Sequence, residues 1–459
     1  MHIYILRRLL LMVPTLFGIT LVVFTVMAAS PGGISAQSLV EGQNLEPEAK
    51  KALEDYYNRR YGLDQPAPLQ YLRWLNNVSP IGFAVAEDGS YGGFSFSKGA
   101  DLGDSFRYGR PVADLVAERV PITILLNVVS IPIIYVIAIA IGVHAATERG
   151  KRFDVSASLI LLALWSVPTM LAGVLLIGFF ASDQYWRWFP TSGLSDRAAL
   201  DMPFLPHWAE AGDLALLFAL ACAGALLFVA ASRHLPATLR GAFAAAVGAL
   251  LGLGMAQQLD GGGVLATPLL ALLLGGLGYA IGRAEFAALR TALLGLTGVA
   301  LGIGLAAQWA SGEFTPGFLL DRLWHLALPI FCLSYGGFAF LAKLTRTALL
   351  ENLLADYART ARAKGVAERD VLWRHVFRNS LLPLITVSAG LLPGLLAGSV
   401  IIETLFSIDG MGKLAVEAVK GRDRELVLSI TLIGGVLTLV GYLIADLCYA
   451  IADPRISYD

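Results

Sequence analysis

The sequence has little charge. Only 15% of its 459 residues are Asp, Glu, Lys or Arg, whereas 56% are hydrophobic. Soluble domains carry about 25% charged residues, so a soluble protein of this composition would need a very large core and almost no charged surface. Lipid covering much of the surface explains the composition more simply. The formal net charge of −1 gives no indication of nucleic-acid binding, and we expect no such partner.

Cysteine is scarce and unpatterned. Cys222, Cys332 and Cys448 fall inside or at the end of apolar segments, and no pair has the spacing of a metal site or of a disulfide framework. The six histidines are scattered and form no His-Glu-x-x-His motif. We therefore expect core cysteines, no metal ligands and no cofactor bound by this chain.

Motifs of nucleotide binding and catalysis are also missing. The nearest approach to the phosphate-binding pattern Gly-x4-Gly-Lys-[Ser/Thr] is SIDGMGKL, with Ser407 in place of the first glycine and Leu414 in place of Ser/Thr. GLSDRA is not a nucleophile elbow. We expect that the chain is not an enzyme and that any use of ATP belongs to separate subunits. A membrane enzyme is kept as an alternative.

Long apolar segments dominate the chain. A bilayer span needs about 20 apolar residues, and ten segments of about that length contain no charged residue. They predict an all-α polytopic membrane protein. The first segment, 9–29, is longer than the apolar core of a cleaved signal peptide, so we expect it to be retained as a helix. The ten segments are 9–29, 121–143, 155–181, 214–232, 241–259, 262–282, 291–310, 326–342, 380–402 and 426–445.

The distribution of Lys and Arg predicts the orientation. Cytoplasmic loops carry an excess of these residues, and here the excess falls in the even-numbered loops and at both ends of the chain. The largest group lies in 343–378, after the eighth segment. Both termini are therefore expected in the cytoplasm, and 30–120 outside it. Within 30–120, EPEAKKALEDYYNRRYG and YLRWL predict helices, the first ended by Gly62, and EDGSYGGFSFSKGADLGDSF predicts a loop. GRPVADLVAERV predicts an amphipathic surface helix.

The basic loop after the eighth segment has structure of its own. Leu350, Leu353, Leu354, Tyr357 and Ala361 recur at helical spacing, and a glycine follows four residues after the last of them. A second helix then begins in AERDVLWRHVFRN. Such a helical hairpin fits a docking element for a cytoplasmic partner. A loop that only sets orientation is the alternative.

An ordered set of motifs carries a family resemblance. DYARTARAKGV and RHVFRNSLLPLIT resemble the coupling loop of permease subunits from bacterial ABC importers of the dipeptide/oligopeptide, binding-protein-dependent class. The wider family's loop begins Glu-Ala-Ala; here the triplet is Arg359-Thr360-Ala361, followed by Gly365, as is typical of the peptide branch. LRRLLLMVPTLFGITLVVFTV, ERVPITILL, FPTSGL, HLALPIFCL, IIETLFSIDGMGKLAVEAV and DPRI extend the resemblance over 1–195 and 322–459.

The resemblance implies a fold, a location and partners. It implies a six-helix type I importer permease in the bacterial inner membrane, paired with a second homologous permease subunit, two cytoplasmic ATPase subunits and an extracytoplasmic substrate-binding protein. ATP and Mg would be used by the ATPases. The implied cargo is a di- or oligopeptide, with nickel chelates or other small solutes as alternatives. The implied ATPase-coupling residues are Asp356, Tyr357, Ala358, Arg359, Thr360, Ala361, Arg362, Ala363, Lys364 and Gly365.

The chain departs from the six-helix plan by four additional predicted spans. We expect 1–120 to hold the first helix and the extracytoplasmic segment, 121–195 spans two and three, 196–322 the inserted segment, and 323–459 the rest of the core with coupling loop 343–380. Four is an even number, so the insertion keeps the coupling loop on the cytoplasmic side. Its Gly- and Ala-rich, uncharged spans predict peripheral packing through small residues, with regulation or partner binding as the alternative.

Few ionisable residues lie near the spans. Glu403 and Asp446 both sit at span ends, where structural hydrogen bonding or snorkelling is the usual role. The resemblance places Glu403 at a position typical of the family, so we keep it as a possible pathway or structural residue. An ion-coupled secondary transporter, which would use such acids near the middle of the membrane, is the alternative function.

Overall fold

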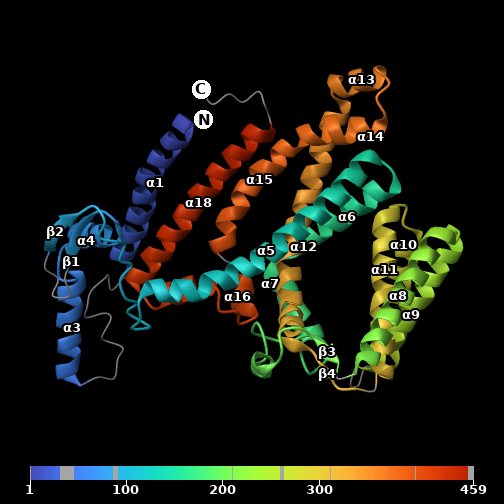
Figure 1. Cartoon of the computed structure of the whole chain (residues 1–459), viewed down its shortest axis with the longest axis horizontal. Coiled ribbons are helices and arrows are strands. Elements are labelled where there is room, and N and C mark those ends of the chain that lie inside the picture. Colours follow the sequence, from blue (N-terminus) through green and yellow to red (C-terminus); the bar gives the residue numbers. More distant parts are fainter. Residues whose placement is uncertain are drawn as a thin grey trace. The chain divides into compact units, whose positions relative to one another are not determined.

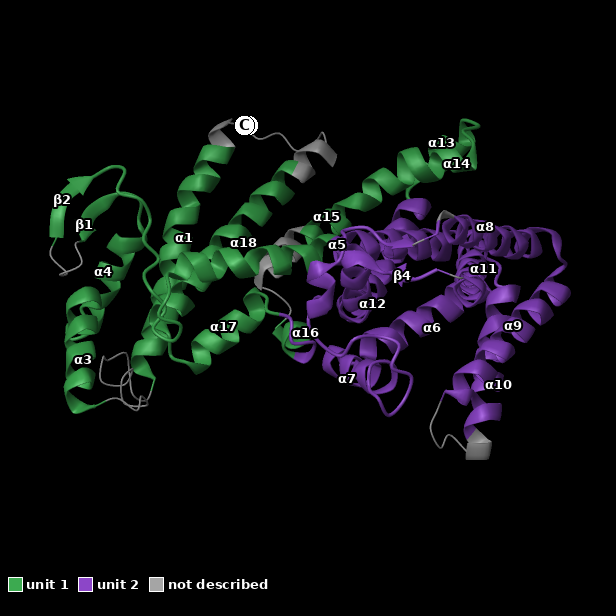
Figure 2. Cartoon of the chain, turned by 60° about the horizontal axis from the view of Figure 1, so that its bottom comes forward, with its two compact units in different colours: residues 1–128, 355–404, 409–459 green, residues 129–354, 405–408 purple. Residues whose placement is uncertain are grey.

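The chain divides into two compact units, each built mainly of helices (Figures 1 and 2). One comprises 1–128, 355–404 and 409–459, and the other 129–354 and 405–408. The computed structural model describes residues 2–30, 46–85, 91–208, 210–258, 263–310, 312–397 and 400–452.

The first unit contains three long helices. α1 (His2–Ala29) and α15 (Phe377–Ala397) both pack against α18 (Arg424–Ala452) (Figure 1). Asp446 forms an ion pair with Arg8, with 2.9 Å between the carboxylate and the guanidinium. This pairing fits the structural role expected for an acid at a span end.

The segment between α1 and α5 is folded. α3 (Pro47–Tyr61) ends at Gly62, which has a φ of 64°, as the sequence predicted, and α4 (Ala67–Val78) contains the predicted helix YLRWL. The stretch expected to be a loop contains strand β2 (Tyr91–Ser95), which pairs antiparallel with β1 (Gly82–Val85). Phe94 of β2 lies opposite Phe83 of β1, with ring centres 5.3 Å apart. Such a cross-strand aromatic pair stabilises a hairpin that the glycines of β2 obscured in the sequence.

One expected boundary is absent. The sequence predicted a surface helix leading into a separate span, whereas α5 runs without interruption over Val112–Thr147. Its first turns are buried by residues of the same unit: Val112 and Leu115 pack with Met411, Leu414 and Leu426. An apolar face that the sequence assigned to the membrane surface is therefore covered by protein.

The third predicted span is bent. α6 (Arg152–Ser166) and α7 (Thr169–Phe180) meet at an angle of 90°. The break is at Pro168, which precedes the first residue of α7. Val167 is extended, with a ψ of 120°, because a residue before proline disfavours the helical region.

The four predicted inserted spans are all present as helices in the second unit. α8 (Ala211–His234) pairs with α11 (Ala287–Trp309), and α9 (Ala237–Gln257) pairs with α10 (Gly263–Arg283). The first pair is close enough to require glycine, because a Cβ on Gly224 would lie 2.1 Å from the carbonyl oxygen of Gly298. This is packing through small residues, as predicted.

A short strand pair flanks the helices α8 to α11. β3 (His207–Trp208) comes before α8, β4 (Phe314–Thr315) follows α11, and the two are antiparallel, with Trp208 opposite Phe314. Asp213 of α8 accepts a hydrogen bond from the Gly312 N–H at 2.7 Å. The ends of the inserted helical segment therefore meet.

The described helices account for nine of the ten predicted spans. Eight are long and apolar enough to cross a membrane, among them α12 (Gly317–Leu354), and the bent pair α6–α7 makes a ninth. The remaining prediction, 380–402, falls on α15 and α16 (Val400–Leu405), and part of it, 398–399, lies outside the described residues. The tenth span and the cytoplasmic location of the termini stay predictions.

Candidate functional site

The predicted coupling residues form a short helix with a tightly defined end. α13 covers Asp356–Ala363. Gly365 follows it with a φ of 77°, which favours glycine. The Gly365 N–H donates to the Arg362 carbonyl at 2.9 Å, and the Val366 N–H donates to the Ala361 carbonyl at 3.2 Å. These two bonds make a Schellman motif, so the glycine turn that the sequence predicted is present.

The start of this helix differs from the prediction. The periodicity favoured one helix from 349 onward, but α12 ends at Leu354 and Ala355 is extended, with a ψ of 152°. After the turn come α14 (Glu368–Asp370) and a π-helical segment, η2 (Val371–Val376), which continues into α15. α13 packs on η2, forming a compact hairpin at one end of α15 (Figure 1).

Burial divides the residues of α13 into two sets. Ala358 and Ala361 are buried, at 0% and 8% exposure, as are Val371 and Val376 of η2. The resemblance counted these two alanines among the coupling residues, and their burial shows that their small side chains pack within this chain. The exposed set is Asp356, Tyr357, Arg359, Thr360, Arg362, Ala363, Lys364 and Gly365.

One ion pair joins the two arms of the hairpin. The Arg362 guanidinium binds the Glu368 carboxylate, with Nη2 to Oε1 at 2.8 Å and Nε to Oε2 at 3.0 Å. The hydrogen bond from Arg362 lowers the pKa of Glu368. Both side chains are exposed, so the pair adds little stability and mainly restrains the turn. Asp356 and Arg359 approach only to 3.6 Å and remain open to solvent.

Glu403 is fully buried and holds the start of another helix. Its Oε2 accepts the Lys413 N–H at 2.9 Å, in the first turn of α17 (Met411–Lys420). Its Oε1 lies 3.2 Å from the Thr123 hydroxyl, which in turn accepts the Met411 N–H at 2.8 Å. A carboxylate at a helix N-terminus satisfies otherwise unpaired donors. Of the two roles kept open, this arrangement supports the structural one.

The turn before α17 is shaped around that carboxylate. A Cβ on Gly410 would lie 2.5 Å from Cδ of Glu403. Asp409 binds Lys413 at 2.8 Å and Arg119 at 3.0 Å. Burial would raise the pKa of Asp409, but these two cations outweigh it and lower that pKa. SIDGMGKL is thus a capped helix start, consistent with the absence of a phosphate-binding pattern.

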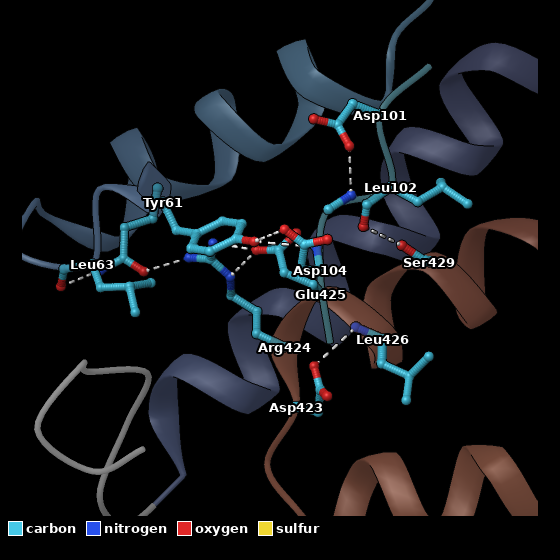
Figure 3. A network of polar contacts seen from close by, with 12 residues as sticks. Tyr61, Leu63, Asp101, Leu102, Asp104, Asp423, Arg424, Glu425, Leu426 and Ser429 are labelled. Carbon is cyan, nitrogen blue, oxygen red and sulfur yellow. Dashed lines mark hydrogen bonds and ion pairs between the residues drawn. The ribbon is translucent and has the colours of Figure 1, made fainter. Parts of the chain in front are cut away.

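A second buried network joins the segment before α5 to α18. Arg424 and Glu425 are 1% and 3% exposed and form an ion pair. The Arg424 guanidinium donates to the Gln70 side chain at 3.1 Å and lies 6.0 Å from the centre of the Tyr61 ring. Figure 3 shows Tyr61, Asp104 and Arg424 converging, and the Tyr61 hydroxyl donates to Asp104 at 3.3 Å. Burial raises the pKa of Tyr61.

Asp423 caps α18 within the same network. Its carboxylate accepts the Ser105 hydroxyl at 2.5 Å and the Arg107 and Leu426 N–H groups at 3.2 Å each. The sequence did not identify these residues as a network. The partners lie more than 300 positions apart, and only the run Arg-Asp-Arg-Glu beside an uncharged span gave a signal.

The fold defines a multi-span helical membrane protein with one folded segment between its first two long helices. Residues 138–458 match the family described as "Binding-protein-dependent transport system inner membrane component", and residues 1–127 match the family described as its N-terminal part. Together these matches cover most of the chain, which therefore belongs to this family of inner-membrane transport permeases.

Curated relatives match along almost the entire chain. The Oligopeptide transport system permease protein AppB of Bacillus subtilis is 28% identical over 456 residues, covering 99% of each chain. The Peptidoglycan transport system permease protein YejB of Agrobacterium fabrum is 27% identical over 492 residues, covering 99% of this chain and 98% of its own. The Inner membrane ABC transporter permease protein YejB of Escherichia coli O157:H7 is 24% identical and covers 99% of each.

Proposed function

We propose that this chain is the permease subunit of an ATP-driven importer of di- or oligopeptides. The observation that carries the proposal is the exposed α13 hairpin, with its glycine turn, in a chain whose relatives are named as peptide and oligopeptide transport permeases. The proposed complex contains a second homologous permease, two cytoplasmic ATPase subunits and an extracytoplasmic binding protein.

The hairpin is suited to transmit movement. Coupling requires that ATP and substrate each favour one state of the transporter over another, so the element between them must move as a unit. The Schellman turn, the buried alanines and the Arg362–Glu368 pair make α13 and η2 such a unit. We assign contact with the ATPase to the exposed side chains, chiefly Tyr357, Arg359 and Lys364.

The nucleotide chemistry is assigned to the partners. SIDGMGKL, the nearest sequence to a phosphate-binding loop, has its N–H donors at Met411 and Lys413 engaged by Thr123 and Glu403. ATP and Mg are therefore assigned to the ATPase subunits, and this chain is assigned no catalytic role and no cofactor.

The environment of Glu403 also bears on the ion-coupled alternative. An acid that carries a coupling ion exchanges partners during transport, whereas this carboxylate is fully buried and already accepts donors from α5 and α17. The arrangement favours the ATP-driven function. Peptides and nickel chelates are distinguished by which of them stimulates ATP hydrolysis in the purified complex.

Substitution at Gly365 tests the proposal. Gly365→Pro fixes φ near −65° and removes the N–H that binds Arg362, whereas Gly365→Asn tolerates a positive φ. In proteoliposomes containing the complex and its binding protein, we expect the proline variant to lose ATP-dependent peptide uptake and the asparagine variant to keep most of it. Both should insert normally. Full uptake by the proline variant would overturn the coupling assignment.

A further inference from the structure

Three potential metal ligands meet in the second unit. Asp196 precedes the short helix η1 (Arg197–Asp201), and Asp321 and His325 lie one turn apart near the start of α12. Each offers one ligand atom, and these atoms lie within 4.8 Å of one another. Among the residues that the structure describes, this is the group of His, Cys, Asp and Glu side chains with such spacing.

The hydrogen bonding of His325 leaves one ring nitrogen available to a metal ion. The His325 Nδ1 lies 2.9 Å from the Asp321 carbonyl oxygen, and since a carbonyl can only accept, Nδ1 carries the hydrogen. In the neutral ring Nε2 then presents a lone pair. The His325 side chain is only 1% exposed, and its Nε2 is buried without a hydrogen-bond partner. Metal-binding histidines are commonly oriented by such a bond from the other ring nitrogen.

The atom facing that lone pair is another electron donor. Oδ1 of Asp196 lies 3.6 Å from Nε2, and two such atoms attract each other only through a shared cation or proton. If an ion lay about 2.1 Å from each atom, the angle between the two bonds at the ion would be about 120°, near the tetrahedral value. The Asp196 side chain is 78% exposed, so the site is open to solvent on that side.

The surrounding contacts hold the two segments together. The Asp321 carboxylate accepts the Asp196 N–H at 3.0 Å. The Trp324 indole donates to the Trp188 carbonyl at 2.7 Å and stacks on Phe189, with ring centres 4.6 Å apart. The ligands are therefore positioned by packed structure on both sides.

We propose that Asp196, Asp321 and His325 bind a divalent transition-metal ion of the zinc class. An imidazole with carboxylates suits such ions, whereas Ca²⁺ and Mg²⁺ prefer all-oxygen sites. The ion links the segment before η1 to α12, and water or a group from a docking partner completes its coordination. The sequence predicted no metal ligands, since its cysteines and histidines match no ligand motif, and Asp196 and Asp321 are 125 positions apart.

Metal titration of the purified full-length protein tests the site. After chelator treatment and dialysis, Zn²⁺ binding is measured by calorimetry, and Co²⁺ binding by its visible absorption. Asp196→Asn and His325→Gln are compared with Asp201→Asn and His207→Gln, which remove exposed groups of the same types outside the cluster. Because the Asp196 side chain is exposed to solvent, Asp196→Asn is the variant that should disturb folding least.

We expect one ion per chain in the parent protein and in both controls. Asp196→Asn should weaken binding at least about tenfold, and His325→Gln should abolish the nitrogen-ligand signature of bound Co²⁺. A chain that binds neither ion at micromolar concentration would overturn the proposal, and so would binding by Asp196→Asn equal to that of the parent. In that case the contact between Asp196 and His325 is an ion pair only.

Discussion

The residues around Glu403 show how closely a buried carboxylate can specify its surroundings. Its oxygens receive donors from Thr123 and Lys413, and Gly410 leaves room for its Cδ. The side chain cannot move away without leaving the Thr123 and Lys413 donors without their acceptor in the interior, which is costly. The sequence indicated that Glu403 was unusual, but it offered no way to identify donors up to 280 positions away.

Gly410→Ala tests this packing directly. Gly410 has a φ of −96°, so the backbone accepts alanine and any loss comes from the contact with Glu403. We expect a loss of about 1 to 3 kcal/mol of stability, measured by thermal unfolding in detergent. Gly434→Ala is the matched control, because a Cβ there meets nothing within 4 Å. Equal stability of Gly410→Ala and the control would contradict the account of this site.

At the scale of elements, apolar length predicted where most helices lie but not where they break. The bend at Pro168 has a local cause, and a proline inside a span indicates it. The break at Ala355 has no such local cause in the sequence, since the apolar periodicity continues through it. The burial of Ala358 and Ala361 was equally hidden, because small residues suit contact with the chain's own η2 as well as with a partner.

Photo-crosslinking tests whether the coupling hairpin meets the ATPase. Tyr357 is 38% exposed on α13, and Tyr91 is 57% exposed on β2. Replacing either tyrosine with benzoylphenylalanine conserves an aromatic ring. In the intact complex we expect the probe at 357 to crosslink to the ATPase and the probe at 91 to give no such product. Labelling of the ATPase from both positions, or from 91 alone, would contradict the assignment.

At the scale of the whole molecule, we predict that helices α8 to α11 form a removable insertion. Their ends meet at the β3–β4 pair, with Trp208 opposite Phe314, so a tight turn can replace everything between. Replacing 209–313 with Asn-Gly, a sequence suited to a two-residue hairpin, removes four predicted spans. We expect the coupling loop to stay cytoplasmic, as measured by labelling the Lys364→Cys variant from either side of the membrane.

The control for that deletion removes an odd number of spans. Deleting α8 alone should disturb the orientation of the helices downstream of it, because charge-directed insertion alternates sides with each span. If the larger deletion also exposed position 364 on the outer face, the predicted orientation of the insertion would be wrong.

We propose that this chain works as the permease of an ATP-driven importer. The most direct test of this proposal is purification of the tagged protein from its native membrane in mild detergent, with mass spectrometry of the proteins that accompany it. We expect recovery of an ATPase and a second permease, and loss of the ATPase from the Gly365→Pro variant. Reproducible purification of the chain without any ATPase would contradict the proposal and favour an ion-coupled transporter.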